Sequence, residues 1–177
     1  MLHGNIGVDI DGPLAKFIEK YRKFCINNYG DFKIGYIDEL RLGAFFNSDD
    51  FDEIEVEEGS IDGIEKLSRH YELHIISGRT FYMREKTEKW IKRHFWGKFK
   101  SLNFINLNRN GSKYDVCKRL DCGILIEDEK YFLNGIKSDV LVIFYRTPYN
   151  IDVEPNPNIK IVNSWKEITD LLIKQKV

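Results

Sequence analysis

Acidic, hydroxyl and basic side chains recur in this 177-residue chain at the ends of short apolar segments or at the start of a predicted helix. The residues placed in this way are Asp9, Asp11, Ser77, Lys113, Glu127 and Asp128. If the apolar segments are parallel β-strands, their carboxyl ends meet at one edge of a sheet, where open α/β sheets bind their ligands. We therefore expect these side chains to converge on a single rim.

This combination of side chains suits phosphoryl transfer through a covalent aspartyl phosphate. A carboxylate can attack phosphorus, and a second carboxyl group can protonate the leaving oxygen and later activate water. Asp9 and Asp11 are two residues apart and therefore share one face of an extended chain. The Ser77 hydroxyl and the Lys113 ammonium can bind phosphoryl oxygens, and Mg²⁺ held by oxygen ligands would offset the negative charge.

Alternating strands and helices are predicted to carry these residues to the rim. Apolar and β-branched runs predict strands over residues 6–10, 72–76, 102–107, 123–126, 140–145 and 159–162. Helical spacing, helped by capping boxes at 112–115 and 164–167, predicts helices over 14–29, 60–70, 80–95 and 112–120, between the fourth and fifth strands, and from 164 onward. The pattern predicts an α/β fold in which helices cover both faces of a parallel sheet.

The segment 16–54 interrupts this alternation, because it contains no convincing strand and its second half predicts short helices and loops. We expect a core domain of residues 1–15 and 55–177, with a small, mainly helical cap of residues 16–54 inserted after the first strand over the carboxyl edge. The aromatic side chains of this segment have two possible uses, stacking on a base of the substrate or packing against one another inside the cap. Packing is the favoured interpretation. The aromatic residues concerned are Tyr21, Phe24, Phe45, Phe46 and Phe51.

The composition is that of an ordinary globular protein and argues against several functional classes. The chain has 27 lysines and arginines against 28 aspartates and glutamates, so it does not resemble a uniformly basic nucleic-acid-binding protein. No apolar run approaches the ~20 residues of a membrane span, and the first residues lack the pattern of a secretory signal. Three cysteines without an export signal predict reduced thiols and a cytoplasmic location.

The ordered motifs resemble those of phosphatases of the haloacid dehalogenase (HAD) superfamily. The matching segments are Asp9-Ile10-Asp11-Gly12, Ile75-Ile76-Ser77-Gly78-Arg79, Lys113 and Ile124-Leu125-Ile126-Glu127-Asp128. They follow one another in the order of the family, each at a predicted strand end or helix start. The resemblance implies a HAD-like Rossmannoid three-layer core with a parallel sheet, and a small helical cap after the first motif.

The same resemblance implies the roles of the reacting groups. It implies that Asp9 is the nucleophile and that Asp11 is the general acid and base. It also implies that Ser77, Gly78 and Lys113 bind the phosphoryl group.

A metal site is implied as well. The resemblance implies that Mg²⁺ is held by Asp9, the backbone carbonyl of Asp11 and Asp128, with Glu127 as a supporting acid. Arg79 is a further candidate for a contact with the substrate.

A narrower resemblance is to the 5'(3')-deoxyribonucleotidase family and its bacterial relatives. The segments that carry it are 59–80, 90–92, 127–128, 147–150 and 162–165. It implies a substrate that is a ribo- or deoxyribonucleoside monophosphate, with no stable nucleic-acid partner and no membrane; it leaves the oligomeric state open.

Three other functions stay open from the sequence. The first is the same chemistry on a sugar phosphate or another small metabolite. The second is a receiver-like signalling protein that accepts a phosphoryl group, although receivers place their phosphorylated aspartate on a later strand than their acidic pair. The third is a polynucleotide end-processing phosphatase, which the acidic segment 49–58 disfavours because it would repel a polyanion.

Overall fold

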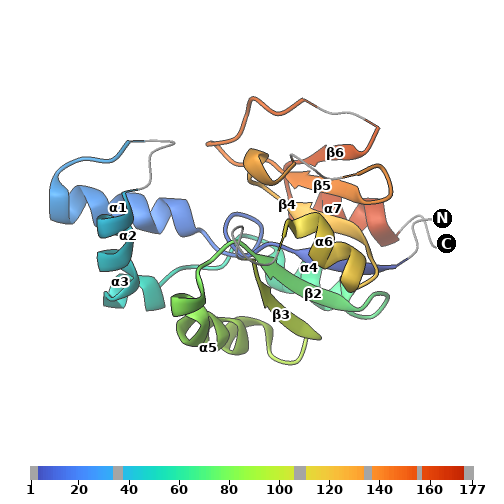
Figure 1. Ribbon diagram of the computed structural model, residues 1–177, viewed down its shortest axis with the longest axis horizontal. Coiled ribbons are helices and arrows are strands. Elements are labelled where there is room, and N and C mark those ends of the chain that lie inside the picture. Colours follow the sequence, from blue (N-terminus) through green and yellow to red (C-terminus); the bar gives the residue numbers. More distant parts are fainter. Residues whose placement is uncertain (1–3, 34–37, 106–110, 134–136, 155–156, 174–177) are drawn as a thin grey trace.

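A six-stranded sheet forms the centre of the protein (Figure 1). The computed structural model describes residues 4–33, 38–105, 111–133, 137–154 and 157–173. Within these residues the strands pair in parallel, in the order β3-β2-β1-β4-β5-β6. The strands are β1 (Asn5–Val8), β2 (Leu73–Ser77), β3 (Ser101–Phe104), β4 (Cys122–Glu127), β5 (Leu141–Tyr145) and β6 (Ile159–Val162). The predicted α/β fold with a parallel sheet is confirmed.

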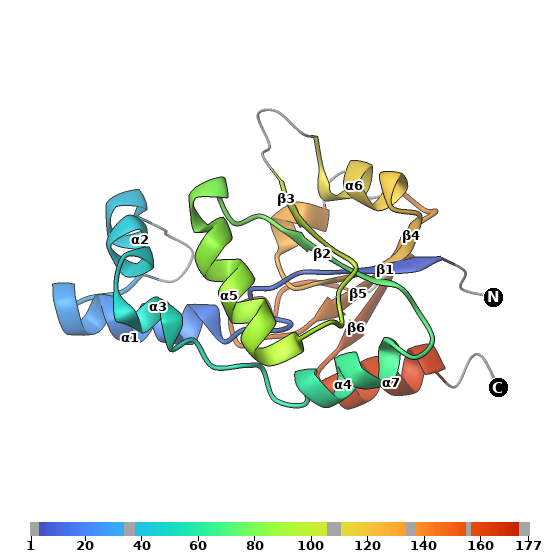
Figure 2. The ribbon, with the colours of Figure 1, turned by 90° about the horizontal axis from the view of Figure 1, so that it is seen from below.

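Helices cover both faces of the sheet, as the alternation of elements predicts (Figure 2). One face carries α6, and the other carries α4, α5 and α7. Short 3₁₀ helices, η1 and η2, follow β2 and β4. The bounds are α4 (Ser60–Leu67), η1 (Phe81–Met83), α5 (Arg84–Phe95), α6 (Lys113–Arg119), η2 (Lys130–Leu133) and α7 (Trp165–Ile173). Among the described residues, none of the helices has the length and apolar character to cross a membrane.

The two helical layers create an apolar core on each side of the sheet. On β4, Ile124 and Ile126 belong to one core cluster, whereas Leu125 between them belongs to the other. The first cluster includes Trp165 of α7, and the second includes Val116 of α6. Because both faces of a parallel strand are buried, the strand is a continuous apolar run, and its first polar residues appear where it leaves the sheet.

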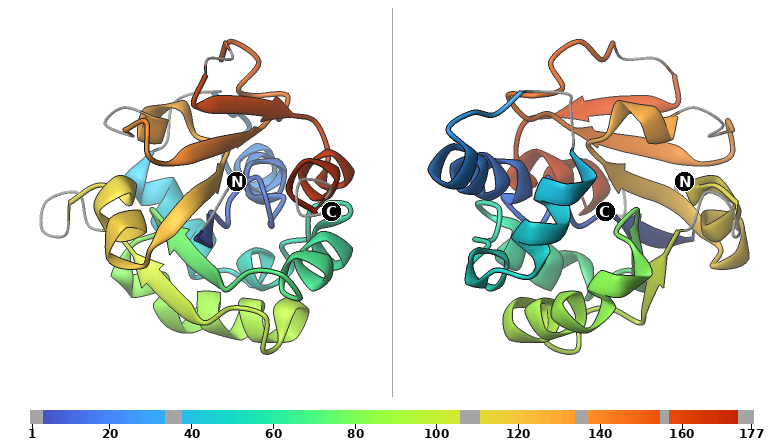
Figure 3. Two further views of the ribbon diagram at one scale, coloured as in Figure 1. Left: turned by 90° about the vertical axis from the view of Figure 1, so that its right-hand side faces the viewer. Right: turned by 60° about the vertical axis from the view of Figure 1, so that its left-hand side comes forward.

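A helical segment made of α1 (Phe17–Tyr29), α2 (Glu39–Phe46) and α3 (Asp49–Asp52) follows β1. It lies beyond the carboxyl ends of the strands, at the left of Figure 1 and in the foreground of the right-hand view of Figure 3. Its interior is built around Phe45, whose ring lies 5.2 Å from that of Phe24 and 5.8 Å from that of Phe51. The predicted packing of these aromatic side chains is confirmed.

The helix expected from residue 14 begins three residues later, at Phe17. Residues 10–15 form a tight turn in which the N–H of Gly12 donates to the carbonyl oxygen of Ala15 over 2.9 Å. Ala15 also forms a bridge with Val56, where the chain returns from α3. This pairing between the two connecting segments holds residues 13–15 out of the helix, and Pro13 therefore lies in the turn.

The structure differs in detail from two further expectations. The helix expected between β4 and β5 is, in its described part, the short 3₁₀ helix η2; residues 134–136 lie outside the described residues. The third strand ends at Phe104, and the remainder of its expected range beyond residue 105 also lies outside them.

Gly63 provides a test of the packing between α4 and α7. A Cβ atom at Gly63 would lie 2.3 Å from Cε3 of Trp165, whose indole N–H donates to the carbonyl oxygen of Pro13 over 2.6 Å. Gly63→Ala should therefore lower the free energy of unfolding by about 1–3 kcal/mol. Gly43→Ala is the matched control, because a Cβ at this helical position meets nothing within 4 Å, and it should raise stability by about 0.5–1 kcal/mol.

Urea unfolding of both variants measures these effects. Equal stability of the two variants would contradict the close approach of Trp165 to α4.

Candidate active site

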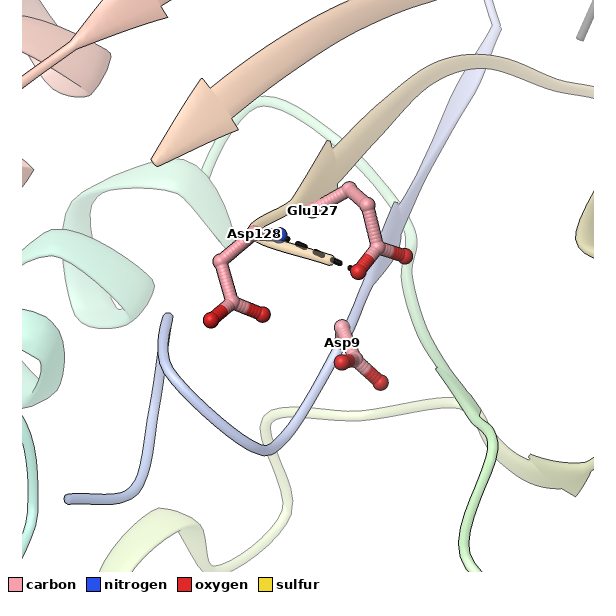
Figure 4. Close-up of side chains that lie close together, drawn as sticks. All are labelled: Asp9, Glu127 and Asp128. Atoms are coloured by element: carbon pink, nitrogen blue, oxygen red, sulfur yellow. Dashed lines mark hydrogen bonds between the residues drawn. The ribbon is translucent and has the colours of Figure 1, made fainter. Parts of the chain in front are cut away.

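Three carboxyl groups meet where β1 and β4 leave the sheet (Figure 4). Asp9 directly follows β1, Glu127 ends β4, and Asp128 comes next. An oxygen of each carboxyl group lies within 4.8 Å of an oxygen of the other two. The backbone N–H of Asp9 donates to the carbonyl oxygen of Ile126 over 2.9 Å, so the pairing of the two strands continues into the site and fixes its position.

Lys113 brings a positive charge to this cluster from the first residue of α6. Its Nζ lies 2.5 Å from Oε2 of Glu127 and 3.0 Å from Oδ1 of Asp9, and the side chain is fully buried. Burial works against the ammonium, but the charges and hydrogen bonds of Asp9 and Glu127 outweigh it and raise the pKa of Lys113. The capping box predicted between Ser112 and Asp115 is confirmed. It fixes the start of α6 and therefore the position of Lys113.

Glu127 is the partner that holds Lys113 in this buried position. Its Oε2 accepts from Lys113, and its Oε1 accepts from the backbone N–H groups of Asp128 at 3.1 Å and Glu129 at 2.9 Å. Both carboxylate oxygens of Glu127 are therefore already used within the protein. Asp9 and Asp128 are better placed to offer oxygens to a ligand.

The cluster carries more negative than positive charge. Burial raises the pKa of Asp9 to about 7, with Lys113 acting against the shift and Glu127 and Asp11 adding to it. Burial, together with the charges of Glu127 and Asp9, also raises the pKa of Asp128. Three carboxylates beside one ammonium leave an excess of two negative charges when all are ionised, and a divalent cation with oxygen ligands fits this excess.

Gly12 makes room for the Asp128 carboxylate. A Cβ atom at position 12 would lie 2.1 Å from Oδ2 of Asp128, and the backbone φ of +97° is one that residues with a side chain rarely adopt. The turn after Asp11 therefore lies in direct contact with the carboxylate of Asp128. The chain that follows β1 thus borders the cluster of three carboxyl groups.

Asp11 lies beside this cluster and is held by Arg79. Nη2 of Arg79 donates to Oδ1 of Asp11 over 2.6 Å, and Nε donates to Oδ2 over 2.9 Å. The Arg79 side chain is 2% exposed and that of Asp11 is 27% exposed. The expected contact of Arg79 with substrate stays a prediction, since the structure shows its guanidinium already bound to the protein.

Ser77 and Gly78 form the loop at the end of β2. Oγ of Ser77 accepts from the backbone N–H of Arg79 over 3.2 Å, which leaves its own hydroxyl hydrogen free to be donated to an anion. A Cβ atom on Gly78 would lie 2.8 Å from Cζ of Phe132. The Phe132 ring also lies over Lys113, with Nζ 4.1 Å from the ring centroid.

Sequence reasoning missed the place of Phe132, since it is one aromatic residue in a segment predicted only as a helix. Its contact with Lys113 joins two segments that no local pattern connects.

Asn150 is a second residue that sequence reasoning did not single out. Its Nδ2 donates to the carbonyl oxygens of Asp128 at 2.8 Å and Tyr145 at 3.0 Å. Its Oδ1 accepts from the backbone N–H of Thr147 over 2.8 Å. Asn150 thus fixes the loop after β5 to the backbone of Asp128; the one sequence signal was its place in the segment 147–150 that supports the nucleotidase resemblance.

A cavity of about 420 Å³ lies next to the cluster, between the start of α1 and the loop after β5. Gly12 and Asp128 belong to its lining, to which Phe17, Tyr21 and Tyr149 contribute aromatic side chains. A volume of this size is typical of small-molecule sites. The cavity therefore has room for the organic part of a small substrate beside the acidic cluster.

Solved structures with the same fold are HAD-type proteins. A haloacid dehalogenase-like hydrolase from Streptococcus pneumoniae superposes with a TM-score of 0.68 at 14% identity, over 95% of this chain and 97% of that chain. CbbY from Rhodobacter sphaeroides in complex with phosphate gives 0.64 at 16% identity, over 95% and 96%. The HAD protein YfnB from Bacillus subtilis bound to magnesium gives 0.66 at 12% identity, over 97% and 99%.

These similarities establish that the chain has the HAD-like α/β fold. At 12–16% identity they show the fold alone. No protein-family model matches the chain, and no curated protein matches its sequence. The narrower resemblance to nucleotidases stays a prediction, since none of the three structures is described as a nucleotidase.

The raised pKa of Asp9 predicts how the metal-free protein responds to pH. The group ionises near 3.8 when unfolded and near 7 when folded, so the stability it contributes is full below about pH 4 and is lost as the pH rises toward about 7. Asp9→Asn removes the buried charge with little change of shape. In a metal chelator, the free energy of unfolding of the variant should therefore depend less on pH between pH 4 and pH 8 than that of the natural protein.

Urea unfolding between pH 4 and pH 8 measures this difference. Parallel pH profiles for the two proteins would show that Asp9 does not carry an unfavourable buried charge.

Proposed function

We propose that this protein is a Mg²⁺-dependent phosphomonoesterase that forms a phosphorylated intermediate on Asp9. The observation that carries the proposal is the buried group of Asp9, Lys113, Glu127 and Asp128 at the carboxyl edge of a HAD-like sheet. A phosphoryl group under attack by a carboxylate needs positive charge around its oxygens. The fixed ammonium of Lys113 supplies one such charge, and a metal ion held by the carboxylate oxygens would supply more. Asp11, held two residues from Asp9 with part of its side chain exposed, supplies the second carboxyl group.

In the first step, a carboxylate oxygen of Asp9 attacks phosphorus and the bond between phosphorus and the ester oxygen breaks. The leaving oxygen takes a proton from the carboxyl group of Asp11 and departs as an alcohol. In the second step, Asp11 takes a proton from water, whose oxygen attacks the phosphorus of the aspartyl phosphate. The bond from phosphorus to Asp9 breaks, and inorganic phosphate leaves.

The remaining residues bind and orient the phosphoryl group in this proposal. The Lys113 ammonium and the Ser77 hydroxyl donate to its oxygens, together with the backbone of the Gly78 loop. Glu127 holds Lys113 in place, and Phe132 shields the ammonium from water on the side toward Gly78.

The chemistry of the cluster fits Mg²⁺, which would neutralise phosphoryl oxygens when bound. Asp9 and Asp128 would hold it, together with the backbone carbonyl of Asp11. Glu127 supports the site through Lys113 and the backbone N–H groups of residues 128 and 129.

For the substrate, we propose a ribo- or deoxyribonucleoside monophosphate. The support is the cavity beside Asp128, whose aromatic surface suits a nucleoside, and the sequence resemblance that includes Asn150. A sugar phosphate is the second candidate, because a mutant of CbbY, which shares the fold, has been solved in complex with xylulose-(1,5)-bisphosphate. In both cases α1–α3 would act as a cap over the site.

The proposed place of action is the cytoplasm, on free metabolites. The three cysteines, Cys25, Cys117 and Cys122, are buried free thiols, which agrees with a reducing compartment.

Phosphate release is the direct test. With Mg²⁺ present, we expect turnover of a subset of ribo- and deoxyribonucleoside 5'- and 3'-monophosphates in preference to sugar phosphates and p-nitrophenyl phosphate. Asp9→Asn should lower kcat by at least about a hundredfold, because the nucleophile is lost.

Other outcomes have distinct meanings. Turnover of sugar phosphates alone would support the proposed reaction but would show that the substrate is a sugar phosphate and not a nucleotide. A long-lived phosphoprotein after acetyl phosphate treatment, without turnover, would support the receiver-like alternative.

Mg²⁺ binding can be tested without activity. Mg²⁺ should raise the thermal midpoint of the natural protein, because a ligand that binds only the folded state stabilises it. Gly12→Ala should lose most of this increase, because its Cβ would displace the Asp128 carboxylate. Gly43→Ala serves as the control and should keep the full increase; an equal response from both variants would exclude Asp128 as a ligand.

A further inference from the structure

Arg79 binds Asp11 through a two-pronged contact from the loop after β2. Nε and Nη2 face the two carboxylate oxygens of Asp11 at 2.9 and 2.6 Å. This is the side-by-side geometry in which a planar guanidinium binds a carboxylate most strongly. The two residues are 68 positions apart in the chain, so the contact is built by the fold.

The guanidinium is itself held by a further hydrogen bond and lies close to two aromatic rings. Nη1 donates to Oγ1 of Thr87 on α5 over 3.1 Å, and Thr87 is fully buried. The aromatic rings of Phe17 on α1 and Phe51 on α3 lie 5.7 and 5.1 Å from the guanidinium carbon. Arg79 therefore lies where the core sheet, α5 and the α1–α3 segment meet.

This environment leaves Arg79 little capacity to bind a substrate. Its side chain is 2% exposed, and all three of its nitrogen atoms already donate to Asp11 or Thr87. Asp11, by contrast, keeps 27% of its side chain exposed. A substrate can therefore approach Asp11 but not the guanidinium behind it.

We propose that Arg79 is a positioning residue, which fixes the Asp11 carboxyl group so that its exposed side faces the leaving oxygen of the substrate. The inference rests on the proposed function. Asp11 is partly exposed in the turn after β1, and without the two hydrogen bonds from Arg79 its carboxyl group would be free to adopt several rotamers. A fixed proton donor avoids that loss of freedom at the moment of reaction.

Arg79 also pairs with the carboxylate that neighbours Asp9 in the sequence. Asp9 is ion-paired with Lys113 and Asp11 with Arg79, so each acid has a cation of its own on a different segment. Lysine cannot replace arginine here, because one ammonium cannot reach both oxygens of Asp11 and Thr87 in a fixed fork.

The dependence of rate on the leaving group tests the proposal. An aryl ester such as p-nitrophenyl phosphate has a leaving oxygen that needs little protonation, whereas an alkyl phosphate needs a proton donor. Arg79→Lys should lower kcat/KM for the alkyl ester by about 50-fold and for p-nitrophenyl phosphate by less than about fivefold, since general acid catalysis is typically worth about 10²–10⁴. kcat/KM reports the steps up to release of the alcohol, and so isolates the proton donation.

Three further variants serve as comparisons for Arg79→Lys. Asp11→Asn should show the same dependence on the leaving group, more strongly. Arg69→Lys, an exposed arginine close after α4, is the matched control and should change neither substrate. Thr87→Val removes one anchor of the guanidinium with little change of shape, and should show the Arg79→Lys pattern in weaker form even if Arg79→Lys does not fold.

The outcomes separate this inference from the proposed function. Equal losses for the two esters in Arg79→Lys and Thr87→Val would overturn the positioning role, and so would a change in KM alone, which would indicate a substrate contact. A higher kcat in either variant would also overturn it, because Arg79 would then be restraining Asp11. If the natural protein hydrolyses neither ester while Asp9→Asn is equally inactive, the proposed function itself fails.

Discussion

The burial of the Lys113 ammonium is the interaction on which the rest of the site depends. Removing this charge from water is costly, and the cost is offset only because carboxylates of Asp9 and Glu127 lie 3.0 and 2.5 Å away. The three residues come from β1, β4 and the start of α6, so the requirement that the charge be paired fixes these elements relative to one another. Backbone N–H groups that donate to Glu127 complete the arrangement.

The same requirement explains why the polar residues lie at strand ends. Strands β1 and β4 are buried on both faces by helices, so an unpaired charge within them would be costly. The first positions at which a carboxylate can be held are the residues where the strands end, where backbone N–H groups and α6 become available. The parallel order of the sheet brings those positions to one edge, the edge that faces α1–α3.

This is also why the sequence could predict much of the fold and the identity of the clustered residues, but not their partners. Apolar runs followed by acids are local patterns, and so are capping boxes, so the strands and the place of Lys113 could be read from them. The pair of Asp11 and Arg79, by contrast, joins residues 68 positions apart, and the contact of Phe132 with Lys113 depends on how η2 packs against the start of α6. The late start of α1 has the same origin, because the bridge from Ala15 to Val56 is a contact between distant segments.

Asp9 and Asp11 show how the fold gives different environments to two neighbouring carboxyl groups. Asp9 is buried against Lys113, and burial raises its pKa to about 7, whereas Asp11 is partly exposed and held by Arg79. Their cations come from two separate elements, α6 and the loop after β2. In the proposed reaction, a nucleophile and a proton donor two residues apart need this separation, because each must meet a different atom of the same ester.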